Sequence, residues 1–139
     1  MIEEQIKELN EEVKVKLAPS SIQGVGVFAI CDIKQGERVY CNFSNRSKHY
    51  SIPYDMLIRL RPEVRELVLE RWPNIINGGE FLSPNSDAIL TSFMNHGGDN
   101  SNYDPITDLA TKDIPKNTEV LEDYRKFPNS EKIYKFLCK

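Results

Sequence analysis

The chain of 139 residues lacks any excess of basic charge. Its 18 lysine and arginine residues are outnumbered by 21 aspartate and glutamate residues, which gives a formal net charge of −3. Proteins that bind nucleic acid by neutralising phosphates carry a basic stripe or patch. We therefore expect no direct nucleic-acid binding. A weakly acidic surface would instead suit a basic protein segment as a partner.

Long apolar runs are missing as well. No stretch approaches the roughly 18 consecutive apolar residues that indicate a membrane-spanning helix. The first residues, MIEEQIKELNEEVKVK, are amphipathic and acidic, without the basic region and apolar block of a secretory signal. These absences predict a cytoplasmic protein that does not enter a membrane.

Cysteine and histidine are scarce. The chain has three cysteines (Cys31, Cys41 and Cys138) and two histidines (His49 and His96). A structural zinc site needs four ligands, commonly in close pairs, and no CxxC pair occurs here. We therefore predict no metal site, and we interpret the cysteines as reduced thiols.

Composition and length are ordinary for one globular domain. The apolar fraction is 40% and the charged fraction 28%, and a chain of this length can close a hydrophobic core. Apolar spacing predicts a helix over residues 2–12 and a helical insert over 44–85, with helices starting near Ser51 and Arg61. An apolar stripe after Ser130 predicts a terminal helix in the tail 125–139, which would pack inward or form a homodimer.

Short strands separated by turn residues are predicted for most of the remaining chain. Alternating apolar and polar residues indicate a strand over 13–19. Residues 27–33 and 38–43 have the pattern of a β-hairpin around a turn at 34–37. Three later segments share the strand pattern: 88–94, 108–114 and 118–124. The overall pattern is mainly β with an α insert.

Three local features could carry chemistry, although each is weak alone. Gly24-Val25-Gly26 is typical of a tight turn or bulge, and it does not fit a dinucleotide-binding loop because a strand follows it. Asn95 and His96, in FMNHGGDNSN (93–102), indicate hydrogen bonding within a loop. A tyrosine at the end of a strand, such as Tyr124, usually packs its ring in the core.

In this order the three features resemble the motifs of the SET-domain family of protein lysine methyltransferases. GVGVFAICDIKQGERV (24–39) is similar to the opening motif of the family, and FMNHGGDNSN is similar to its Asn-His segment. LATKDIPKNTEVLEDY (109–124) is similar to the closing motif, which ends in a tyrosine. The resemblance extends from about residue 13 to residue 127. The length resembles that of a minimal member of bacterial, phage or viral type.

The resemblance implies a particular fold. It is a SET-domain β-clip-like arrangement of several small sheets with a knot-like C-terminal crossing, a rare exception to unthreaded chains. The chain would form a single SET domain over 1–139. Its N-terminal helix (1–12), helical insert (44–85) and C-terminal tail (125–139) would be additions to the sheets.

The resemblance also implies a cofactor, S-adenosylmethionine, and a partner, a protein substrate with an accessible lysine. Tyr124 would be the catalytic residue, with its hydroxyl near the sulfonium methyl and the lysine nitrogen. The glycine loop would lay bare backbone against the methionine part of the cofactor, with Asn95 on its polar groups. The implied cofactor contacts are Gly24, Val25, Gly26, Asn95, His96, Tyr124 and Phe127.

The chain departs from the family pattern at several positions. Ser92 stands where many members have arginine, Gly97-Gly98 replaces a Ser-Cys pair, and Ser101 replaces a proline. Glu122 stands where members often have Phe or Tyr in the wall of the lysine channel. We hypothesise that Glu122 lines this channel and biases substrate or product choice. The alternative is a solvated residue at the edge of a strand.

Three functions remain open on the sequence alone. The first is an active protein-lysine methyltransferase. The second is a SET-like module that binds cofactor or peptide but has lost turnover, as Ser92, Gly97-Gly98 and Glu122 suggest. The third is a methyltransferase for a non-protein amine.

Overall fold

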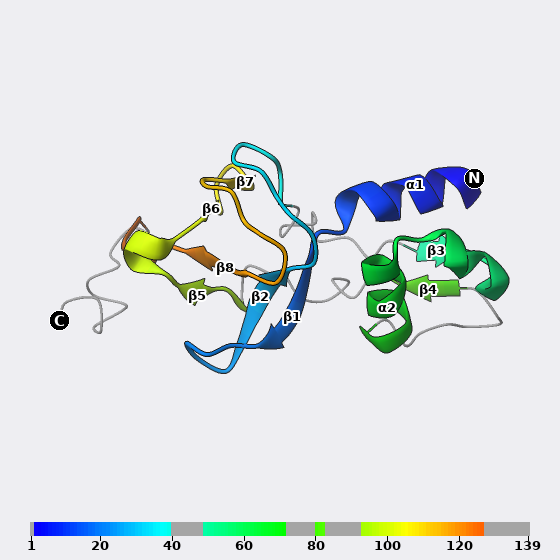
Figure 1. Ribbon diagram of the computed structural model, residues 1–139, viewed down its shortest axis with the longest axis horizontal. Helices are drawn as coiled ribbons and strands as arrows, with labels where there is room; N and C mark the ends of the chain where they lie inside the picture. The colour runs from blue at the N-terminus through cyan, green and yellow to red at the C-terminus, as the bar shows by residue number, and fades with distance from the viewer. Residues whose placement is uncertain (1, 40–48, 72–79, 83–92, 127–139) are drawn as a thin grey trace.

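The computed structural model describes residues 2–39, 49–71, 80–82 and 93–126 (Figure 1). In these ranges the α-helices are α1 (Ile2–Glu12) and α2 (Pro62–Arg71). The strands are β1 (Val15–Pro19), β2 (Val25–Ala29), β3 (His49–Ser51), β4 (Glu80–Leu82), β5 (Asn95–His96), β6 (Tyr103–Asp104), β7 (Leu109–Ala110) and β8 (Glu119–Glu122). The 3-10 helices are η1 (Tyr54–Arg59), η3 (Gly98–Asn100) and η4 (Tyr124–Lys126).

The strands form three small sheets. The largest has the order β1-β2-β8-β5, in which β1, β2 and β8 pair antiparallel and β5 joins β8 in parallel. The other two are the pairs β3-β4 and β6-β7. The predicted fold class, mainly β in several small sheets with few helices, is confirmed. The tail after Lys126, which the expected knot-like crossing involves, lies outside the described residues.

The predicted hairpin of 27–33 with 38–43 is wrong in its pairing. Both edges of β2 are already taken, by β1 on one side and by β8 on the other. The chain from Gly36 therefore pairs with β7: Arg38 bridges Leu109, and the N–H of Gly36 donates to the Ala110 carbonyl at 2.8 Å. Residues 40–43 lie outside the described ranges.

The insert has both expected helices and one element that was missed. The predicted starts near Ser51 and Arg61 correspond to η1 and α2. The two-stranded sheet β3-β4 was not predicted, because three residues per strand are too few to show an alternating pattern. No helix among the described residues is long and apolar enough to cross a membrane.

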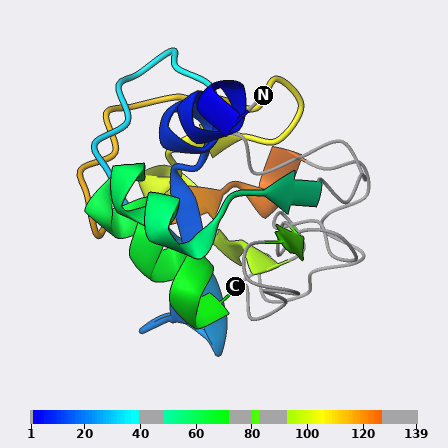
Figure 2. The ribbon, with the colours of Figure 1, turned by 90° about the vertical axis from the view of Figure 1, so that its right-hand side faces the viewer.

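Two hydrophobic clusters hold these parts together. The first joins α1 to the insert, which lie together at one end of the molecule (Figures 1 and 2). Its buried members are Ile6, Leu9, Val13, Ile30, Ile52, Leu57, Leu60, Val64, Leu67 and Val68. The second lies among the strands: Val15, Val27, Ala29, Ile33, Val39, Met94, Tyr103, Ala110, Ile114 and Val120. The amphipathic α1 thus completes a core that the insert cannot close alone.

The strand predicted over 88–94 is displaced in the structure. Residues 88–92 lie outside the described ranges, and the strand β5 begins only at Asn95. Met94 is buried as expected, whereas Phe93 is 38% exposed and does not belong to a strand. The Asn-His pair therefore forms the strand itself, and its backbone bonds to β8 fix where the two side chains lie.

Candidate active site

The glycine loop, residues 20–26, turns tightly and runs into the first two residues of β2. The N–H of Ser20 donates to the Gly24 carbonyl at 2.8 Å, and the N–H of Ile22 donates to Ser20 Oγ at 3.0 Å. Gly24 has φ of +48°, a left-handed conformation that favours glycine. Val25 follows with 47% of its surface exposed. The loop therefore presents backbone and the apolar side chains of Ile22 and Val25 to solvent.

Gly26 has no room for a side chain. A Cβ built there would lie 2.3 Å from Glu119 Oε2 and 3.1 Å from Asn95 Nδ2. Glu119 comes from β8, beside β2 in the sheet, and its other oxygen, Oε1, accepts a 2.7 Å hydrogen bond from Ser20 Oγ. The second glycine is therefore needed because a carboxylate and an amide pack against the loop.

Asn95 is 9% exposed and points its amide nitrogen at the glycine loop. Nδ2 lies 2.9 Å from Glu119 Oε2, 3.1 Å from the Gln23 carbonyl and 3.4 Å from the Val25 carbonyl. A carbonyl and an ionised carboxylate only accept hydrogen bonds, so the NH₂ group must face them. The amide oxygen, Oδ1, accepts no hydrogen bond from the described residues.

Tyr124 is held at both ends by the Asn-His segment. Its hydroxyl donates to the Met94 carbonyl, and its backbone N–H donates to His96 Nδ1 at 3.1 Å. The two rings lie 5.2 Å apart, tilted by 38°. Because Nδ1 accepts this bond, it carries no proton to share with Asp123 Oδ1, 3.9 Å away. His96 thus positions the tyrosine through its side chain.

A family model of the SET domain matches residues 24–125, well over half of the chain. The chain belongs to the SET-domain family. The matched range contains Gly24–Gly26, the Asn-His strand and Tyr124.

This SET domain is also similar to solved structures. The Chaetomium thermophilum Polycomb Repressive Complex 2 bound to GSK126 is 26% identical, with a TM-score of 0.44, over 87% of this chain and 17% of that chain. A candidate histone methyltransferase of Plasmodium falciparum is 21% identical, with a TM-score of 0.38, over 81% of this chain and 93% of that chain. The SET domain spans about a sixth of the Polycomb chains that it matches. A search of curated proteins found no match.

The glycine pair that departs from the family pattern has a structural reason in this SET domain. The parallel pairing of β5 with β8 brings Gly97 against Leu121, and its N–H donates to the Glu122 carbonyl at 3.0 Å. A Cβ on Gly97 would lie 2.6 Å from Leu121 Cβ. Gly98 then opens η3 with φ of +54°. A serine at position 97 would therefore meet Leu121, and a cysteine at position 98 would have to adopt the positive φ.

Ion pairs connect the rest of the GGDNSN loop to the residues that follow β8. Arg125 Nη2 lies 3.0 Å from Asp99 Oδ1, and its Nε lies 2.9 Å from Asp123 Oδ1. These bonds to Arg125 lower the pKa of Asp123. Asp99 is largely exposed, so its ion pair adds little stability. The contacts nevertheless give the loop a defined place beside η4.

Glu122 is a buried carboxyl in this site region. It is 5% exposed, and its Oε2 has no hydrogen-bond partner among the described residues. Burial raises its pKa from 4.5 to about 7. The alternative of a solvated edge residue is therefore wrong. The strand predicted over 118–124 ends earlier than expected: β8 ends at Glu122 and Tyr124 begins η4, so the two residues do not share a strand face.

Several residues that build the site were not predicted from the sequence. Asn102 clamps β8: its Nδ2 donates to the Glu119 carbonyl at 3.0 Å, and its Oδ1 accepts from the Leu121 N–H at 2.8 Å. Ser20 and Glu119 join the glycine loop to Asn95. The only signal in the sequence was the position of Glu119 in the closing motif. Ser92 and Phe127 lie outside the described residues.

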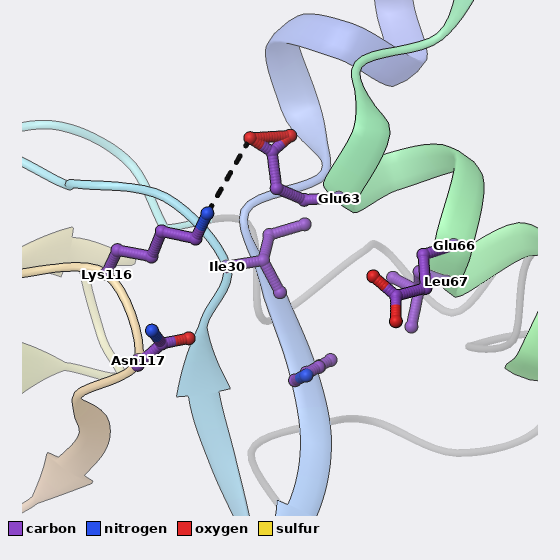
Figure 3. A pocket seen from close by; sticks show the side chains of 7 residues that line it. Ile30, Glu63, Glu66, Leu67, Lys116 and Asn117 are labelled. Carbon is purple, nitrogen blue, oxygen red and sulfur yellow. Dashed lines mark ion pairs between the residues drawn. The ribbon is translucent and has the colours of Figure 1, made fainter. Parts of the chain in front are cut away.

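One pocket lies away from this site. It has a volume of about 140 Å³ and is lined by Lys16, Ile30, Glu63, Glu66, Leu67, Lys116 and Asn117. Figure 3 shows Lys116 facing Glu63, with Nζ and Oε1 4.0 Å apart. Among the described residues, the predicted cofactor, catalytic and channel residues do not line it: Gly24, Val25, Gly26, Asn95, His96, Glu122 and Tyr124. In the described part of the chain, no group of three or more His, Cys, Asp or Glu residues could hold a metal ion.

Proposed function

We propose that this SET domain transfers a methyl group from S-adenosylmethionine to the side-chain amine of a lysine in a protein. One observation carries the proposal. The pairing of β5 with β8 brings Tyr124 against the Asn-His strand, while Asn95 reaches from that strand to the glycine loop. Residues about 100 positions apart in the chain thereby form one site from the three family motifs.

The residues of the site fit the methionine part of this cofactor. No atom of the described residues lies within 4 Å of where a Cβ of Gly24 would stand, so a ligand can approach the backbone closely there, whereas Glu119 fills the corresponding space at Gly26. Asn95 Oδ1 has an open acceptor position, which suits the α-ammonium group of an amino acid. Phe127 remains a predicted adenine contact. S-adenosylmethionine supplies an electrophilic methyl group on a positively charged sulfur.

Tyr124 would align the target amine. Its hydroxyl proton is committed to the Met94 carbonyl, so the phenolic oxygen acts as an acceptor. An acceptor oxygen here would orient N–H groups of the amine and make weak C–H contacts with the transferred methyl. The reaction is a direct displacement, so this alignment is the main contribution of the chain.

Glu122 would line the channel of the target lysine and select among amines. A lysine must be neutral to attack, and an ionised carboxylate beside it would favour the charged form. With its pKa raised to about 7, the Glu122 carboxyl is partly neutral near pH 7, where it can donate as well as accept a hydrogen bond. We propose that it contacts amines carrying fewer methyl groups, which keep N–H donors.

The acidic net charge of −3 suits a basic protein segment. Cytoplasmic location remains a prediction.

Isothermal titration calorimetry with S-adenosylmethionine tests the cofactor assignment. The wild-type chain should bind, and Asn95→Ala should weaken binding by about tenfold or more, the loss expected for a hydrogen bond to a charged group. Asn100→Ala, an exposed asparagine in the neighbouring loop, is the matched control and should bind as the wild type does. A folded wild-type chain that does not bind the cofactor would contradict the proposal.

A further inference from the structure

We propose that Glu119 is a positioning residue that fixes the orientation of the Asn95 amide and the conformation of the glycine loop. The effect on cofactor binding rests on the proposed function, in which the oxygen of the oriented Asn95 amide faces the cofactor. Its structural part, the coupling of Glu119 to Asn95 and to the loop, holds without any ligand.

Glu119 joins three segments that are distant in the chain. Its Oε1 accepts from Ser20 Oγ at 2.7 Å, at the start of the glycine loop. Its Oε2 accepts from Asn95 Nδ2 at 2.9 Å, on β5. Glu119 itself lies on β8, which stands between β2 and β5 in the sheet. One carboxyl group thus bridges both neighbours of its own strand.

A carboxylate is well suited to this position. The side chains that reach it, a hydroxyl and an amide NH₂, both act as donors, and an ionised carboxylate offers only acceptor sites. An amide can rotate to present either end, but its oxygen would be repelled by the carboxylate and by the Gln23 carbonyl, 3.1 Å from Nδ2. Glu119 therefore keeps Oδ1 of Asn95 available for a donor from outside the chain.

The same carboxyl group shapes the loop. Its Oε2 occupies the space where a Cβ of residue 26 would lie, 2.3 Å away. The Gly26 backbone therefore packs directly against Glu119, and the Ser20 hydroxyl that Glu119 accepts from also accepts from the Ile22 N–H at 3.0 Å. Loss of the carboxyl would remove the charged acceptor of the Asn95 amide and the acceptor of the Ser20 hydroxyl together, leaving Asn95 Nδ2 only the carbonyls of Gln23 and Val25.

The first test needs no ligand. In ¹H–¹⁵N spectra of the wild-type chain, the Asn95 side-chain NH₂ protons should exchange slowly with solvent. In Glu119→Ala they should exchange at least about tenfold faster, as expected when a charge-assisted hydrogen bond is lost. Glu119→Gln keeps an acceptor oxygen of the same reach and should retain slow exchange. Glu66→Ala, an exposed glutamate on α2, is the matched control. Unchanged exchange in a folded Glu119→Ala chain would overturn the inference.

The second test asks whether Glu119 acts through Asn95. Affinity for S-adenosylmethionine should fall by about tenfold to a hundredfold in Glu119→Ala and should largely recover in Glu119→Gln. In the Asn95→Ala background, adding Glu119→Ala should cause little further loss. Independent effects that multiply in the double variant would overturn the inference. If the wild-type chain binds no cofactor but the exchange result holds, the proposed function fails and the positioning role of Glu119 stands.

Discussion

At the residue scale, Tyr124 is positioned by hydrogen bonds to the Asn-His segment and does not itself belong to a strand. Its hydroxyl reaches the Met94 carbonyl, and its N–H reaches His96 Nδ1. The side chain of His96 therefore orients Tyr124, the residue that would align the amine. The sequence motif alone did not indicate this role. The buried Glu122 lies two residues earlier, and its titration gives a direct prediction.

The free energy of unfolding should depend on pH through Glu122. Its pKa is raised from 4.5 to about 7, so the folded chain keeps a proton over this window that the unfolded chain loses. Rising pH through the window therefore lowers the free energy of unfolding, by up to about 1.4 kcal/mol per pH unit. This loss in the free energy of unfolding is absent below about pH 4.5 and complete above about pH 7.

Glu122→Gln cannot ionise and should escape this cost. In urea unfolding, its stability relative to the wild type should rise between about pH 5 and about pH 8.5. Glu66→Gln replaces an exposed glutamate and is the control. Its stability relative to the wild type should be the same at both pH values. A pH-independent difference between Glu122→Gln and the wild type would show that Glu122 titrates normally.

At the scale of elements, the parallel contact of β5 with β8 decides the site. Only two residues of β5 take part, yet they place Asn95 opposite Leu121 and His96 opposite Glu122. Gly97 extends the contact by donating to the Glu122 carbonyl. Its φ of −105° is open to any residue, so the need for glycine there comes from the close approach to Leu121.

Gly97→Ser should therefore destabilise the chain through packing. The added Cβ would meet Leu121 Cβ at 2.6 Å, and we expect a loss of about 1–3 kcal/mol, with β5 pushed away from β8. Gly98→Ala is the comparison: its Cβ meets only His96 at 3.6 Å, so its smaller cost reflects the φ of +54° alone. Urea unfolding of both variants measures this order. Equal stability of Gly97→Ser and the wild type would contradict the close contact.

The sequence predicts the elements that have a long enough pattern or a shared motif. The helices α1 and α2 show apolar spacing over ten or more residues, and both form where expected. Strands of two or three residues, such as β3 and β5, are too short for an alternating pattern, so their bounds were missed. The pairing of 36–39 with β7 depends on which edge of β2 is free, and local sequence does not contain that information.

The same limit applies to the site. Gly24, Gly26, Asn95, His96 and Tyr124 were predicted through motif order, and the structure places these five in one region. The contacts of Glu119 and Ser20 depend on the neighbours of β8 in the sheet. A carboxylate in a closing motif does not reveal which strands lie on either side of it.

At the scale of the whole molecule, the two hydrophobic clusters have different roles. One lies among the strands that carry the motifs, and the other joins α1 to the insert at the opposite end from β5 (Figure 1). The motif residues of the site thus lie on the sheet part. The function proposed for this site is transfer of a methyl group to a protein amine, and it can be tested directly.

The most direct measurement of that activity is transfer of a radiolabelled methyl group from S-adenosylmethionine to the proteins of a cell lysate. The wild-type chain should label protein bands at lysine, and Tyr124→Phe should lose at least about a hundredfold in rate while still binding the cofactor, because the aligning oxygen is gone. Tyr103→Phe, a tyrosine bonded to Asp108 outside the motif site, is a control that tests loss of a hydroxyl alone. Label on protein lysine that depends on Tyr124 is the predicted result. Cofactor binding without any transfer, or full activity in Tyr124→Phe, would contradict the account.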